Sequence, residues 1–167
     1  MIKLLRTICL SVLILFSAHL SAETTEELLV LANKAKQSSA YSTALIHLKN
    51  AVKQDPKNLK ARLQLADLFV FTGQGLQAEV EINKAIRLDA SPSETSILMA
   101  KAKYLQGEFD SLTENINILD LPQPKIARLR AIQGHAFFEQ RKFELAAQMF
   151  QRALSLGSDE VEVLLGQ

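Results

Sequence analysis

The chain has 167 residues, of which 48% are apolar and 6% aromatic, and its 19 Lys and Arg nearly balance its 18 Asp and Glu. This much apolar material can form a sizeable core and excludes a disordered chain, while the mixture of charged residues excludes a multi-pass membrane protein. The net charge of +1 gives no electrostatic reason to expect nucleic acid as a partner, and the scarcity of Gly (6) and Pro (4) favours helices over a turn-rich β fold.

The first 22 residues show the order of segments that is typical of a secretory signal peptide. Lys3 and Arg6 precede an uncharged apolar stretch over 7–18, and small residues ending at Ala22 follow it. We therefore expect export to the periplasm or cell envelope, with cleavage after Ala22. The alternative is an uncleaved anchor, although the apolar stretch is shorter than the roughly 20 residues of a membrane span.

The single cysteine, Cys9, lies inside this apolar stretch. Cleavage after Ala22 would leave a chain without cysteine, which argues against disulfides, thiol catalysis and cysteine-ligated metals. A lipid-acceptor cysteine follows the apolar segment, so Cys9 is not expected to carry a lipid.

The rest of the chain is periodic, with a constant step of 34 along the sequence. Small residues recur early in each repeat, at Ala32, Ala66, Ala100 and Gly134. Later positions keep the same step: Ala44, Ala78, Leu112 and Ala146; Leu48, Ile82, Ile116 and Phe150; Ala51, Ala85, Leu119 and Ala153. Within a helix these offsets place the residues on one face, so small residues are expected where two helices cross.

The pattern predicts helices in pairs along the chain. First helices are expected at 24–37, 58–72, 93–106 and 125–140, and second helices at 41–54, 76–88, 109–119 and 143–156. Turns are expected at 37–39, 73–75 and 106–108, and the prolines after Asp55 and Ser91 mark boundaries between helices.

A fixed period of 34 with small residues at helix crossings resembles the tetratricopeptide repeat. The resemblance implies an all-α fold, a right-handed superhelix of antiparallel helix pairs. After the signal peptide at 1–22 it predicts units at 25–58, 59–92, 93–126 and 127–160, and the start of a truncated fifth unit at 161–167. The third unit is degenerate because Leu112 and Leu119 replace small residues, so its helices should lie further apart or shift. The apolar ending suggests a fragment of a longer array or an end that docks on a partner.

The sequence offers little that would support catalysis. Gly73-Gln74-Gly75 lacks the third glycine and the Lys-Ser/Thr of a phosphate loop, so it is expected to be a turn. His47 and His135 have no second histidine at metal-ligand spacing, and His47 maps to the solvated outer side of a second helix. We therefore expect no enzyme activity, no catalytic residue, no metal and no cofactor.

The resemblance implies a groove lined by the first helices, which would bind a protein or peptide. The family's groove positions fall on Leu29, Asn33, Lys36, Leu63, Asp67, Val70, Ile97, Lys101, Tyr104, Ala131, His135 and Phe138. A place in the core is the alternative for some of them, above all for Leu63 and Ile97. Asp67, Lys101, Tyr104 and Phe138 are the stronger candidates, because aromatic residues beside charges suit binding surfaces. The positive charges of the carboxylate clamp in chaperone-binding members are missing. A partner segment with apolar anchors is therefore expected, rather than a small molecule or an acidic C-terminal peptide.

A more specific resemblance is found in two neighbouring segments, residues 42–58 and Ala61-Arg62-Leu63-Gln64-Leu65-Ala66. Their sequence is similar to the opening repeats of the tetratricopeptide lipoproteins of PEP-CTERM/exosortase loci. That resemblance implies a periplasmic scaffold in exopolysaccharide export or protein sorting, although the family's lipidated cysteine is missing here. Two alternatives remain: an adaptor or pilot in another envelope assembly, such as a pilus or secretion system, or the docking arm of a longer enzyme.

Overall fold

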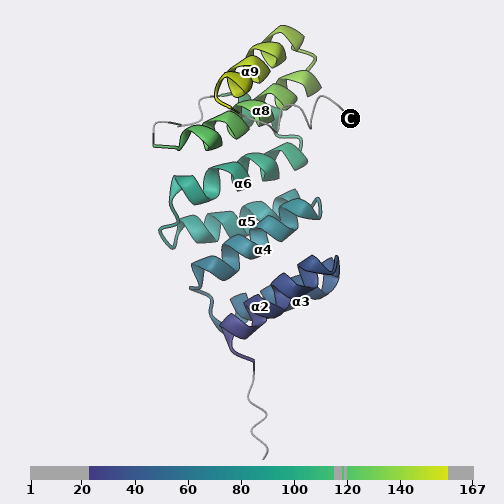
Figure 1. Ribbon diagram of the computed structural model, residues 1–167, viewed down its shortest axis with the longest axis vertical. Helices are drawn as coiled ribbons and strands as arrows, with labels where there is room; N and C mark the ends of the chain where they lie inside the picture. The colour runs from purple at the N-terminus through teal and green to yellow at the C-terminus, as the bar shows by residue number, and fades with distance from the viewer. Residues whose placement is uncertain (1–22, 115–117, 119, 158–167) are drawn as a thin grey trace, which may run out of the picture.

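The computed structural model describes residues 23–114, 118 and 120–157, and this part of the chain is all-α (Figure 1). Its eight helices are α2 (Thr25–Gln37), α3 (Tyr41–Gln54), α4 (Leu59–Phe71), α5 (Gly75–Ile86), α6 (Pro92–Leu105), α7 (Phe109–Thr113), α8 (Gln123–Glu139) and α9 (Phe143–Ser155). They stack in chain order, from α2 and α3 at one end to α8 and α9 at the other (Figure 1). The predicted all-α arrangement of sequential helix pairs is confirmed.

Seven of the eight expected helices begin and end close to the predicted positions. The exception is α7, which was expected to reach residue 119 but ends at Thr113, because Glu114 adopts an extended conformation. The segment after Glu114 alternates Asn and β-branched Ile, which are poor helix formers. Leu119, expected to replace a small residue in this helix, lies outside the described residues.

The degenerate third repeat also packs differently from the others. The helices α2 and α3, α4 and α5, and α8 and α9 pack chiefly within their own pairs, whereas α7 contacts α8 more than α6. Leu112 is only 1% exposed and joins a cluster with Leu129, Ile132 and Ala136 of α8. A large residue at this position therefore directs α7 toward the next helix, which agrees with the predicted shift.

Each turn from a first to a second helix contains one residue with positive φ. These residues are Ser39 (57°), Gly73 (74°), Gly107 (74°) and Arg141 (59°), and they occupy the same position in successive repeats. Glycine adopts this conformation without a Cβ penalty, whereas other residues are disfavoured there by about 1–2 kcal/mol. Only the two glycines signal the positive φ itself in the sequence, although a turn was also expected at 37–39.

The predicted small residues are buried where helices cross. Ala32, Ala44, Ala51, Ala66, Ala78, Ala85 and Ala153 have no exposed surface, and Ala100 and Ala146 are 3% and 2% exposed. In the fourth repeat the small residue is Gly134, and a Cβ built on it would lie 2.5 Å from Phe150 Cε1. Glycine is required there because Phe150 replaces the Leu48 and Ile82 of earlier repeats.

Candidate binding surface

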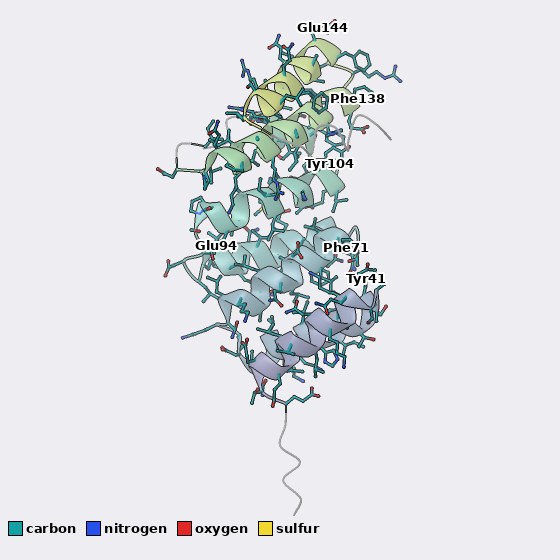
Figure 2. All side chains as sticks on the ribbon, in the orientation of Figure 1. Tyr41, Phe71, Glu94, Tyr104, Phe138 and Glu144 are labelled. Atoms are coloured by element: carbon teal, nitrogen blue, oxygen red, sulfur yellow. The ribbon has the colours of Figure 1, made fainter. Side chains whose placement is uncertain are left out.

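The predicted groove residues lie on α2, α4, α6 and α8, the first helices of the four pairs. We call Asn33, Lys36, Asp67, Val70, Lys101, Tyr104, His135 and Phe138 together the first-helix surface. The helix α6 contacts both α4 and α8, and an ion pair joins α2 to α4. Figure 2 shows Tyr104 and Phe138 on the same long side of the stack as Tyr41 and Phe71, with Glu94 on the opposite side.

At the junction between α2 and α4, two predicted residues contact each other. Lys36 Nζ lies 2.9 Å from Asp67 Oδ2, and the side chains are 30% and 52% exposed. Asn33, one turn earlier on α2, is exposed. Because Lys36 and Asp67 neutralise each other, this end of the surface presents little net charge to a ligand.

At the junction between α6 and α8, Tyr104 is the centre of a half-buried cluster. Its hydroxyl donates to Glu139 Oε1 at 3.2 Å, and its ring centroid lies 5.5 Å from that of Phe109 and 6.3 Å from that of His135. Burial, followed by the Glu139 carboxylate, raises the pKa of Tyr104. Tyr104 is therefore only partly accessible to a ligand.

His135 connects this cluster to Phe150 of α9. Its ring centroid is 5.0 Å from that of Phe150, and in the described part of the chain its buried Nε2 has no hydrogen-bond partner. Burial lowers the pKa of His135, and the nearby Glu139 carboxylate partly opposes this shift. The imidazole is therefore held neutral and acts chiefly as packing between α8 and α9.

The remaining residues differ in their surroundings. Val70 is half-buried against the core formed by α2 to α6, and Lys101 is half-exposed and makes no ion pair within the described residues. Phe138 is 54% exposed, and its ring centroid lies 5.4 Å from that of Phe143 at the start of α9. Phe138 thus contacts the start of α9, the second helix of its own pair.

The remaining groove positions are buried or half-buried, as a role in the core implies, and the expectation that His47 is solvated is wrong. Leu29 and Ala131 are buried, at 1% and 0% exposure, because they pack into the core between helices of one pair. Leu63 and Ile97 are half-buried, and Ile97 packs against the α6–α8 cluster. His47, predicted to be solvated, is also half-buried.

Two residues that were not predicted, Glu139 and Phe143, contact the predicted residues Tyr104 and Phe138. Glu139 follows the residue equivalent to Tyr104 in the next repeat, which is Phe138. Including the residue after the last groove position of each first helix would therefore have identified Glu139.

Within residues 23–114, 118 and 120–157 no three His, Cys, Asp or Glu side chains come together as metal ligands. Among the described helices none is both long and apolar enough to cross a membrane.

Comparison with known proteins agrees with this geometry. The family described as tetratricopeptide repeat matches residues 35–104. Residues 35–104 are therefore similar to tetratricopeptide repeats. Tetratricopeptide repeat domains in general bind protein or peptide partners, and no enzyme family matches. No curated protein matches the chain.

Among solved structures, the N-terminal domain of stress-induced protein-1 from C. elegans is similar to this chain. It is 20% identical, with a TM-score of 0.36, and the match covers 87% of this chain and 97% of that chain.

Proposed function

We propose that this protein is a non-enzymatic scaffold that holds an extended or helical segment of a protein partner along the first-helix surface. The observation that carries the proposal is one contact that recurs between adjacent repeats. Lys36 meets Asp67 across one junction, and Tyr104 meets His135, at the equivalent two positions, across another. The same two positions therefore meet at the first and last junctions between first helices, which suits a ligand that spans several repeats.

The chemistry of the first-helix surface favours a partner with apolar anchors. Lys36 is already neutralised by Asp67, so a terminal carboxylate would find Lys101 as the remaining half-exposed cation of this surface. Val70, Tyr104 and Phe138 supply apolar surface between polar groups. Aromatic side chains next to a few polar groups are typical of the centre of protein interfaces.

We further propose that the scaffold works in the cell envelope, in exopolysaccharide export or PEP-CTERM/exosortase sorting. Two features of the sequence support this proposal. Residues 1–22, which lie outside the described residues, have the pattern of a signal peptide. The sequence of residues 42–66 resembles the opening repeats of the PEP-CTERM/exosortase lipoproteins. N-terminal sequencing of the envelope fraction tests export: a chain that begins at Glu23 supports it, and an intact Met1 on the mature protein contradicts it.

The binding site is tested by placing a photocrosslinking amino acid at Asn33 or Lys101 in cells and, as a control, at Thr43, which is exposed on the second helix α3. A partner crosslinked from the two first-helix positions and not from Thr43 would support the surface. The purified partner is then titrated against Tyr104→Ala, which should weaken binding by about 1–3 kcal/mol because an interface aromatic is lost.

Ile46→Ala is the matched control, since Ile46 is 58% exposed on the outer helix α3. Circular dichroism shows whether each variant retains its helices. Equal affinity of the Tyr104→Ala variant and the unsubstituted chain, with helicity retained, would rule out the first-helix surface as the site.

A further inference from the structure

One carboxylate, that of Glu139, has both Tyr104 and His135 as neighbours. The Tyr104 hydroxyl donates to Glu139 Oε1 at 3.2 Å, and this bond joins the end of α6 to the end of α8. Glu139 follows His135 by four residues in α8, so the two side chains lie on the same face of that helix. The carboxylate thus has a phenol as its present partner and an imidazole as a neighbour on its own helix.

The imidazole of His135 has a polar atom without a hydrogen bond. Within the described part of the chain its buried Nε2 has no partner, and its ring centroid lies 5.0 Å from that of Phe150 and 6.3 Å from that of Tyr104. A neutral imidazole has one N–H donor, whereas an imidazolium has two donors and a positive charge. Protonation of His135 therefore requires an acceptor that the neutral form does without.

Among the described residues, Glu139 is the charged group that can accept a hydrogen bond from a protonated His135. On α9 the imidazole meets an uncharged phenylalanine ring, and on α6 it meets the phenol of Tyr104. Lys101, three residues before Tyr104 on the same face of α6, is a cation and accepts no hydrogen bond. Asp110 of α7, which also packs on α8, already accepts from the side-chain amide that follows α8. Burial lowers the pKa of His135, and the Glu139 carboxylate opposes this shift.

We propose that protonation of His135 transfers Glu139 from the Tyr104 hydroxyl to the imidazolium, and that this exchange is a pH-sensitive switch in the first-helix surface. In the neutral state the bond to Glu139 orients the Tyr104 ring at the junction between α6 and α8. The imidazolium is the stronger partner for the carboxylate, because it adds its own charge to the hydrogen bond. In the protonated state Tyr104 therefore loses the contact that orients it.

The consequence for binding rests on the proposed function. A partner that docks on Tyr104 should bind best while Glu139 holds the ring, because a side chain that is already fixed loses less conformational freedom on binding. The affinity for such a partner should therefore decrease as the pH falls and His135 takes up a proton.

NMR titration of His135 between pH 5 and 8 tests the exchange without any partner. Residues 23–167, the chain expected after cleavage, contain two histidines and two tyrosines, so the signals are few. In Tyr104→Phe the imidazole should bind its proton about three- to tenfold more tightly, because one competing hydrogen bond to Glu139 is removed. Glu139→Gln should have the opposite effect, since the imidazolium loses its counter-ion.

Tyr41→Phe is the matched control, because Tyr41 packs against Phe71 at the other end of the stack (Figure 2) and should leave the His135 titration unchanged. Circular dichroism at each pH shows whether the helices are retained. The same pKa of His135 in Tyr104→Phe and in the unsubstituted chain would overturn the switch. This result is separate from the proposed function, which the binding of Tyr104→Ala tests at a single pH.

Discussion

Arg62 Nη1 lies 2.6 Å from Glu81 Oε2, and the two side chains are only 9% and 10% exposed. This ion pair joins α4 to α5 within the second repeat. Arg62 Nε also donates to the Pro56 carbonyl at 2.8 Å, and Glu81 Oε1 accepts from Lys84 Nζ at 2.6 Å. The pair therefore connects both helices of the repeat to the loop that precedes them.

Removing one partner of this pair should destabilise the fold strongly. We expect Glu81→Ala to lower the free energy of unfolding by about 3–5 kcal/mol, because the buried guanidinium loses its counter-ion. Lys60→Ala, which breaks the exposed pair with Glu26, should cost no more than about 1 kcal/mol. Urea unfolding measures both. The double variant Arg62→Met, Glu81→Leu should be more stable than Glu81→Ala, and the reverse order would contradict this account.

The contact between Gly134 and Phe150 predicts a pair of substitutions that compensate each other. Gly134→Ala should destabilise the chain by about 1–3 kcal/mol, because the added methyl group overpacks the Phe150 ring, despite the better helix propensity of alanine. The double variant with Phe150→Leu has at positions 134 and 150 the same residue types as Ala32 and Leu48 of the first repeat. Most of the lost unfolding free energy should therefore be recovered. Thermal unfolding of the unsubstituted chain, the two single variants and the double variant gives the coupling energy between positions 134 and 150. Strictly additive effects would mean that the two residues do not compete for space.

Ala85 has no exposed surface and packs where α5 meets neighbouring helices. Ala85→Leu should therefore lower the free energy of unfolding by about 1–3 kcal/mol through overpacking. Ile86→Leu, at the next residue and 45% exposed, is the control and should change stability by less than about 0.5 kcal/mol. Equal unfolding midpoints for the two variants would show that the helices separate there without cost.

The buried imidazole of His135 predicts a pH-dependent stability. Burial lowers the pKa of His135 in the folded chain below its ordinary value of 6.5, while Glu139 partly opposes the shift and Tyr104 and Phe150 bring no charge at neutral pH. Between these two pKa values the unfolded state binds more protons, so stability should decrease as the pH falls below about 6.5. Above about pH 7.5 this contribution should be constant.

The measurement is urea unfolding between pH 5 and 8. His135→Gln should remove the pH dependence of the unfolding free energy near pH 6. His47→Gln serves as the control for the other half-buried histidine. An unchanged slope in the His135→Gln chain would assign the pH dependence to other groups.

The repeat step in the sequence was sufficient to predict the helix pairs, apart from the end of α7, and the small residues buried at their crossings. Ala32, Ala66 and Ala100, for example, recur at this step and are all buried. The reason is local, because an amphipathic period and a small residue at a crossing are properties of one or two helices. The pairing of Lys36 with Asp67 was not predicted as a contact, although both were assigned to one surface.

Other features depended on the arrangement of the helices in space. Arg62 and Glu81 belong to different helices with no motif joining them, and they meet only because α4 and α5 pack closely. Leu29 and Phe138 were both assigned to the groove from the repeat pattern, yet Leu29 is buried within its pair and Phe138 is exposed. The repeat pattern gives the position of a side chain on its helix, whereas burial depends on which neighbouring helices it meets, and only the tertiary structure supplies those neighbours.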